Sequence, residues 1–365
     1  MKYIKIYEKF DAYAHNTFRK KFSKEFPDRK IIACNERGYE MRKLSPEQKK
    51  QVREYWEIPK GEDVDYRTHE IMLSIKDDFD PRYLPEYTFR RYIDPFLSDR
   101  RMTWGWDDKN YFDRYLPEVP FPYTYVRNIN GYFLNHNYEP ISKEEAKKIV
   151  AENLPVIIKP TIFSGSGKKI ELIESLEEIE EKFDGHIKDY IVQRLVVQCD
   201  ELKKMSLRCV NIMRIVTAIV EGKPKYMTAV LRCNQSDVIA DNIDAENSDG
   251  TLFIGITEDG KLNDTGYHVN NRKIKKLISG FEFGGLQIPS YKEAIDVALK
   301  AHAQMPMFGV LGWDITIDEN NKPLVMEYNL KGIGVYYYQL ANGPFFGEDS
   351  KYFARIASEN MKRDN

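Results

Sequence analysis

Apolar and polar positions between residues 155 and 330 alternate in short blocks that are typical of β-strands joined by tight turns. Pairs of these blocks predict three hairpins: Ile212–Val220 with Tyr226–Cys233, Leu252–Thr257 with Lys261–Asp264, and Trp313–Ile317 with Pro323–Tyr328. Further strands are predicted at Pro155–Lys159, Lys169–Ile173 and Tyr190–Val197, and helices at Glu174–Phe183 and Tyr291–Ala303. Mostly antiparallel strands without a regular βαβ alternation indicate an α+β fold and disfavour a Rossmann domain.

Helical patterns dominate residues 1–103, which are rich in Lys, Arg, Glu and Tyr. A capping-box pattern of Ser45 and Gln48 predicts a helix over Pro46–Trp56, and a second helix is predicted at Arg67–Ile75. The same pattern recurs at Ser142, with Glu145 three residues later, and predicts another helix there. The N-terminal 103 residues are therefore expected to form a mainly helical region.

The composition narrows the class of protein. Of 365 residues, 42% are hydrophobic and 31% are charged, which is typical of a globular protein. The formal net charge of −2 argues against a nucleic-acid partner. The longest apolar runs fall far short of the roughly 20 residues that span a bilayer, and the N-terminus lacks the apolar core of a signal peptide. No spacing among the four cysteines suggests a metal site or a disulfide framework, so reduced thiols and a cytoplasmic location are expected.

The strongest chemical signal is a pair of carboxylates in the last predicted hairpin. Glu327 and Asn329 are two residues apart on one strand, so their side chains share a face. The hairpin register places Asp314 opposite Met326 or Glu327. Carboxylates in such apolar company are costly unless a cation neutralises them, and oxygen ligands of this kind suit Mg²⁺. The alternative is an acidic face on an exposed hairpin.

A glycine-rich loop follows the strand that ends in Lys159. Its residues run Ser164-Gly165-Ser166-Gly167-Lys168 before the next predicted strand. Glycines allow backbone N–H groups to approach phosphate oxygens, and lysines supply the charge. The loop does not match the Walker A pattern. A plain hairpin turn is the alternative interpretation.

Two arginines fall at nearly opposite positions of another predicted hairpin. Arg214 and Arg232 lie on either side of the Glu221–Pro224 turn. Like charges on paired strands destabilise the sheet unless an anion or a carboxylate lies between them. An anionic substrate or a triphosphate would meet that need. Solvent exposure, or pairing with Asp241 or Glu246, is the alternative.

Other catalytic classes lack support in the sequence. The six histidines have no zinc-site spacing, and no nucleophile-elbow motif occurs. Aromatic residues make up 13% of the chain and include the run Tyr336-Tyr337-Tyr338. That run is a candidate wall for an acceptor pocket, although core packing is the more common role of such residues.

In this order, these elements resemble the ATP-grasp superfamily, and within it the sugar-transfer-associated ATP-grasp group. The resemblance covers roughly residues 83 to 339 and is most specific in its C-terminal half. The residues that carry it are Asp108-Lys109-Asn110, Val210–Thr217, Leu231-Arg232, Asp241-Asn242, Gly312–Ile315 and Glu327-Tyr328-Asn329.

The resemblance implies an ATP-grasp fold, in which two α+β lobes hold ATP between them. Residues 104–200 would form the lobe with the glycine-rich loop, and residues 201–365 the lobe with the metal-binding hairpin. By resemblance, the ATP-binding residues are Lys109, Lys159, Ser164, Gly165, Ser166, Gly167, Lys168, Gln193, Arg194, Leu195 and Val196. The metal ligands for two Mg²⁺ ions are Asp314, Glu327 and Asn329, and the catalytic residues are Asn211, Arg214 and Arg232.

Two positions depart from the group's pattern. Gln193 stands at the adenine edge where an acidic residue is common. Lys331 follows the metal-binding strand where smaller residues are frequent, and this affects the expected acceptor pocket.

The activity implied by the resemblance is an ATP-dependent ligase. A carboxylate, such as a sugar uronate or an amino acid, would form an acyl phosphate that an amine converts to an amide, in surface-polysaccharide modification. An ATP-grasp kinase acting on a sugar or other small molecule is one alternative. A nucleotide-binding protein without turnover is another.

Overall fold

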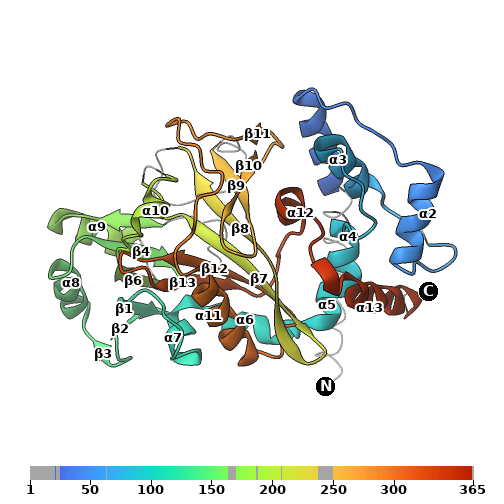
Figure 1. The fold of residues 1–365 in the computed structure, drawn as a ribbon. Coiled ribbons are helices and arrows are strands. Elements are labelled where there is room, and N and C mark those ends of the chain that lie inside the picture. Colours follow the sequence, from blue (N-terminus) through green and yellow to red (C-terminus); the bar gives the residue numbers. More distant parts are fainter. Residues whose placement is uncertain are drawn as a thin grey trace, which may run out of the picture.

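Two antiparallel sheets and a set of helices make up the computed structural model, shown in Figure 1. The structure describes residues 21, 25–62, 64–162, 170–185, 188–206, 208–236 and 250–363. The glycine-rich loop at 164–168 and the acidic residues Asp241 and Glu246 lie outside the described residues. This architecture confirms the predicted α+β class, with helices in the N-terminal region.

The smaller sheet has the strand order β3-β2-β1-β6-β4-β5, and every pairing in it is antiparallel. Its strands are β1 (Thr124–Ile129), β2 (Tyr132–Asn135), β3 (Pro140–Ile141), β4 (Val156–Pro160), β5 (Glu171–Ile173) and β6 (Tyr190–Arg194). Helices α8 (Lys143–Ala151) and α9 (Leu176–Gly185) pack on it through Ala146, Val150 and Ile179. Their burial gives this sheet a separate small core.

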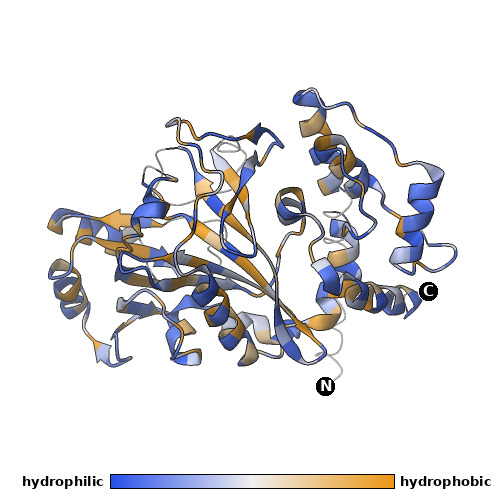
Figure 2. Cartoon of the chain, viewed as in Figure 1, coloured by the Kyte–Doolittle hydropathy of each residue, from blue (hydrophilic) through white to orange (hydrophobic). Residues whose placement is uncertain are grey.

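The larger sheet has seven antiparallel strands in the order β11-β10-β9-β8-β7-β12-β13. Their bounds are β7 (Ile212–Val220), β8 (Lys223–Asn234), β9 (Thr251–Ile256), β10 (Leu262–His268), β11 (Lys273–Ile274), β12 (Val310–Ile317) and β13 (Pro323–Asn329). Figure 2 shows hydrophobic residues along the central strands, whereas α2 is mainly hydrophilic. Strands β7, β8 and β12 contribute residues to two separate buried clusters, so both faces of this sheet are covered.

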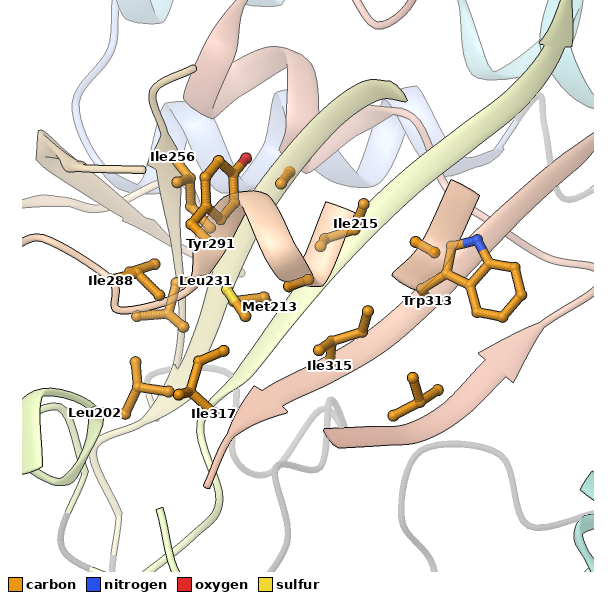
Figure 3. Close-up of a cluster of buried hydrophobic side chains, with 14 of the residues drawn as sticks. Leu202, Met213, Ile215, Leu231, Ile256, Ile288, Tyr291, Trp313, Ile315 and Ile317 are labelled. Carbon is orange, nitrogen blue, oxygen red and sulfur yellow. The ribbon is translucent and has the colours of Figure 1, made fainter. Parts of the chain in front are cut away.

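One face of the larger sheet is covered by α11 (Tyr291–Ala303). Alanines and Tyr291 of this helix share a buried core with alternate residues of β7, β8 and β12. Figure 3 shows Tyr291 in this core together with Ile215 and Leu231. Trp313 lies fully buried in this core, and its indole N–H donates to Thr217 Oγ1 at 2.8 Å. The face that remains is the one toward which Arg214 and Asp314 point.

The opposite face is covered by the N-terminal region together with α12 (Tyr336–Asn342) and α13 (Ser350–Arg363). The Gln339 side chain joins the two parts, because its Oε1 accepts from Leu84 N at 2.7 Å and its Nε2 donates to Leu84 O at 2.9 Å. The N-terminal elements are α2 (Pro46–Tyr55), α3 (Arg67–Lys76), α4 (Glu86–Thr88), the π-helix η1 (Phe89–Ile93), α5 (Asp94–Leu97), η2 (Arg100–Met102) and α6 (Thr103–Trp106). The short elements η3 (Lys109–Tyr111), α7 (Phe112–Tyr115), α10 (Asp200–Lys203) and η5 (Gly347–Asp349) complete the list.

Local sequence signals predicted many of these elements. Both capping boxes are present, at Ser45 with Gln48 and at Ser142 with Glu145. Helix α11 has its predicted bounds. The division of the chain at residues 103 and 200 stays a prediction.

Two predictions about the smaller sheet need correction. The β1–β2 hairpin is absent from the predicted elements, although Asn130-Gly131 is a strong turn signal and both residues have positive φ, 51° and 91°. The strand predicted over Tyr190–Val197 is too long, because β6 ends at Arg194. Beyond it the chain crosses to the larger sheet, where Val197 O accepts from Glu319 N at 3.0 Å.

In the part of the chain that the structure describes, no helix has the length and apolar character needed to cross a bilayer.

We expect the substitution Trp313→Ala to lower the free energy of unfolding by about 3–5 kcal/mol, because it empties a fully buried site and leaves Thr217 without its donor. Urea unfolding monitored by circular dichroism measures this. The matched control is Trp104→Ala, since Trp104 is 64% exposed. Equal shifts for the two variants would contradict the packing described for α11 and the sheet.

Candidate functional site

A β-bulge in the last hairpin brings Asp314 and Glu327 together. Ile315 pairs with Val325, but Asp314 pairs with Glu327, so Met326 is an extra residue on β13. If the pairing of Ile315 with Val325 continued without a bulge, Glu327 would take the place of Tyr328 opposite Trp313 and face the core. Of the two partners predicted for Asp314, Met326 and Glu327, the structure confirms Glu327.

Asn329 completes this acidic hairpin. It lies two residues beyond Glu327, opposite Gly312, and its Nδ2 is 3.4 Å from Gly312 O. Its side chain therefore shares the face of Asp314 and Glu327. The three predicted metal ligands lie on one face of β12 and β13.

Two arginines contact Asp314, Arg214 from the adjacent strand β7 and Arg232 from the next strand, β8. Arg214 pairs with Asp314 across β7 and β12, donates from Nη2 to Asp314 Oδ2 at 2.7 Å and contacts Oδ1 through Nε. Arg232 Nη1 lies 3.9 Å from Asp314 Oδ2. Arg232 pairs with Ile212 rather than with Arg214, so the arginines are diagonal neighbours on one face. The Asp314 carboxylate of the same sheet contacts both of them.

Burial alone would lower the pKa of the Arg214 guanidinium, but the nearby Asp314 carboxylate outweighs it and raises the pKa above its ordinary value. Arg214 is therefore a permanent cation at this position.

Two lysines from the smaller lobe reach the same hairpin. Lys109 Nζ lies 3.3 Å from Glu327 Oε2. Burial, reinforced by the charge of Lys109, lowers the pKa of Lys159 to about 8, and Glu327 partly opposes this shift. Burial would raise the pKa of Glu327, but Lys109, Lys159 and Arg214 together hold it below its ordinary value. Glu327 is thus ionised at neutral pH.

Four cations gather around this hairpin. Lys109, Lys159, Arg214 and Arg232 surround the carboxylates of Asp314 and Glu327. Cations gathered at one site attract anions of high charge. The site therefore suits a polyanion such as a polyphosphate.

A buried polar network fixes the segment that carries Lys109. Arg127 is fully buried, donates from Nη1 to Asn110 O at 2.7 Å and pairs with Asp113. Lys109 N donates to Thr161 O at 3.2 Å, just past β4 and Lys159. The sequence carries no signal for this network, because Arg127 and Asp113 meet only through the packing of β1 against α7.

A small cleft opens beside the two lysines. Its apolar lining includes Phe112, Ile191 and Met326, and its void is about 240 Å³ including the solvent at its mouth. Gln193 also lines this cleft and donates from Nε2 to Thr124 Oγ1 at 2.9 Å. Flat apolar walls with polar groups at the edge are suited to a planar heterocycle.

The other residues predicted at the adenine edge lie further out. Arg194 is exposed and pairs with Glu319 at 3.1 Å. Leu195 and Val196 are half-buried and follow the end of β6.

Asn211 is not brought to the site. It is fully buried, and its Nδ2 donates to Gln198 Oε1 at 3.0 Å and to Leu202 O at 2.7 Å. Its Oδ1 accepts from Ser206 at 2.5 Å. With its amide used in this way, Asn211 fixes the segment between β6 and β7, and its predicted catalytic role is not supported by its position.

The tyrosine run divides between packing and the site. Tyr336 donates to Asn271 Oδ1 at 2.8 Å and Tyr337 to Val269 O at 3.1 Å, so both anchor α12 to the β10–β11 connection. Tyr338 lies beside Arg214 and Asp314, and burial raises the pKa of its hydroxyl. Only this third tyrosine borders the charged cluster.

The donor set of the acidic hairpin fits Mg²⁺. Two carboxylates and one amide supply hard oxygen ligands. Nowhere in the described ranges do three His, Cys, Asp or Glu side chains cluster as a metal site, so a cation here would also need Asn329 and oxygens of a bound ligand.

Residues 89–351 of the chain match the protein family described as sugar-transfer-associated ATP-grasp. No curated protein sequence matches the chain.

Several solved structures are similar at low identity. A D-cycloserine synthetase is 13% identical, with 73% of each chain covered and a TM-score of 0.41. An L-amino acid ligase from Bacillus licheniformis is 12% identical, with 72% of this chain and 49% of that chain covered and a TM-score of 0.39. An N5-carboxyaminoimidazole synthetase from Staphylococcus aureus is 12% identical, with 69% and 51% covered and a TM-score of 0.41. The chain spans about half the length of the last two proteins.

We expect the affinity for inorganic tripolyphosphate to fall as the pH rises through about 8, because Lys159 is a cation below that pH and neutral above it. The linked effect on stability has the opposite sign: the buried ammonium destabilises the fold below about pH 8, and this cost is relieved between pH 8 and the ordinary lysine pKa of 10.5. Calorimetric titration between pH 7 and pH 9 measures the affinity.

The variant Lys159→Arg keeps its charge over this pH range and is expected to lose the pH dependence that Lys159 causes. Any change of affinity with pH that remains in this variant measures the titration of the anion itself. The variant Lys159→Met is expected to bind weakly at every pH. A wild-type pH profile in Lys159→Met would show that another group is responsible.

Proposed function

We propose that this chain, which belongs to the sugar-transfer-associated ATP-grasp family, is an ATP- and Mg²⁺-dependent ligase that joins a carboxylate to an amine. The observation that carries the proposal is the cross-strand pair of Asp314 and Glu327, set on one face with Asn329 and surrounded by four cations. This arrangement supplies oxygen ligands for Mg²⁺ and compensates the charge of a triphosphate.

The ATP-binding groups divide by their place in the site. The cleft beside Gln193 would hold the adenine, with Leu195 and Val196 continuing its edge. Lys109 and Lys159 would bind phosphate oxygens, together with the glycine-rich loop assigned from the sequence. When bound by Asp314, Glu327 and Asn329, Mg²⁺ (two ions in our proposal) supplies further positive charge to the phosphoryl group that is transferred.

The arginines have separate roles in this proposal. Arg214 lies against Asp314 and would turn to the transferred phosphoryl group once Asp314 binds the metal. Arg232 would hold the substrate carboxylate. The carboxylate oxygen attacks the γ-phosphorus, the bond to the ADP oxygen breaks, and an acyl phosphate forms. An amine then attacks the acyl carbon and releases phosphate, giving the amide.

The substrate carboxylate that we propose is a sugar uronate or an amino acid, in the modification of a surface polysaccharide. A cytoplasmic location fits the four cysteines, which are all free and buried. A kinase that phosphorylates a sugar with the same site is the second candidate, because the phosphate-binding groups would serve either acceptor.

We expect Asp314→Asn and Glu327→Gln each to lower phosphate release by about 100-fold or more, because each removes a charged ligand of the proposed metal while keeping the side-chain shape. The assay combines the protein, MgATP, a uronate and an amine donor, and measures phosphate and ADP. The control is Glu293→Gln, an exposed residue of α11 outside the site.

Mass spectrometry of the product separates the candidate activities. An amide with free phosphate supports the ligase, and a phosphorylated sugar without free phosphate supports the kinase. Calorimetric binding of MgATP without any turnover would support a nucleotide-binding protein. Full activity of Asp314→Asn would refute the metal assignment.

A further inference from the structure

The segment from Trp104 to Lys109 runs alongside the end of β13. Tyr328 Oη donates to Trp106 O at 2.7 Å, and Lys331 Nζ lies 3.0 Å from Asp107 Oδ2. Together with the Lys109–Glu327 pair, these contacts align the segment with residues 327–331. The charged site and the end of this segment are therefore parts of one continuous surface.

Trp104 is an exposed aromatic residue at the far end of this surface. Its exposed fraction is 64%, whereas the indoles of Trp56 and Trp313 are buried. Lys331 Nζ lies 5.1 Å from the Trp104 ring centroid. A Cβ added at the neighbouring Gly105 would meet no atom within 4 Å, so the chain next to Trp104 also borders open space.

The position of Lys331 relates Trp104 to the proposed reaction centre. Lys331 follows Glu327 by four residues, which corresponds to at most about 13 Å of extended chain. Met326 lines the cleft beside the lysines, and Glu327 and Asn329 come next. Along β13 and the residues that follow it, Met326 lines the nucleotide cleft, Glu327 pairs with Lys109, and Lys331 contacts the exposed indole.

The chemistry of the surface matches a sugar ring. An indole offers a flat apolar face on which the C–H face of a pyranose can stack. The paired Lys331 and Asp107 place a donor and an acceptor beside it, which suits equatorial hydroxyl groups.

We propose that Trp104, with Lys331 and Asp107, is a saccharide-binding subsite for the sugar unit next to the reacting uronate, so that the acceptor is an oligosaccharide and not a free monosaccharide. This inference rests on the ligase function proposed above. It assigns a purpose to Lys331, one of the two positions at which the sequence departs from the family pattern.

Binding without turnover tests the subsite. The probes are methyl β-glucuronoside and a panel of disaccharides in which glucuronate is linked to glucose, titrated calorimetrically in the presence of MgADP. We expect at least one disaccharide to bind wild-type protein about tenfold more tightly than the monosaccharide. Trp104→Ala should abolish that difference and leave monosaccharide and MgADP binding unchanged, whereas Trp104→Phe should retain part of it. Lys331→Met should weaken disaccharide binding several-fold.

The matched control is Tyr132→Ala, which removes another aromatic residue, 74% exposed, from β2. Equal binding of monosaccharide and disaccharide by wild-type protein, or an unchanged preference in Trp104→Ala, would overturn the subsite. A preference that depends on Trp104, without phosphate release from any amine donor, would support the subsite and refute the ligase. Phosphate release that is equal for both probe lengths and unaffected by Trp104→Ala would support the ligase and refute the subsite.

Discussion

The ion pair between Arg214 and Asp314 is the interaction on which the arrangement of the site depends. It joins the central strands β7 and β12 at a largely buried position, where either charge alone would be strongly destabilising. Arg232 and, through Glu327, the two lysines extend this pair into a network of charged groups. Because these cations are in place before any ligand binds, an anion can bind with little reorganisation.

The N-terminal region contributes to the site through the segment that follows β13. Glu86, nearly fully buried, accepts from Val335 N at 3.0 Å and from Arg90 Nε at 2.6 Å. Val335 lies between Asn329 and Tyr338, so this contact fixes the chain as it leaves β13. The described helices of the N-terminal region thus support the segment that follows the charged hairpin and are not an independent appendage.

Local signals predicted the hairpins, both capping boxes and the charged face of the last hairpin, because alternation and capping are properties of neighbouring residues. Local patterns do not predict interactions between segments that are distant in the sequence, because these depend on how the elements pack. The Arg127–Asp113 pair depends on β1 packing beside α7, and the diagonal placement of Arg214 and Arg232 depends on the register of β7 and β8. Asn211 illustrates the same limit: its motif suggests chemistry, whereas its buried amide is used to fix a connecting segment.

The bulge at Met326 also acts as a check on strand pairing during folding. If β13 continued its pairing beyond Ile315 and Val325 without the bulge, Glu327 would enter the α11 core beside Trp313, and Tyr328 would leave it. An ionised carboxylate in that core would make the misaligned hairpin far less stable than the native one. The residue that gives the site its charge thereby selects the correct register, and the same side chain that would bind the metal helps to determine which folded form the chain can reach.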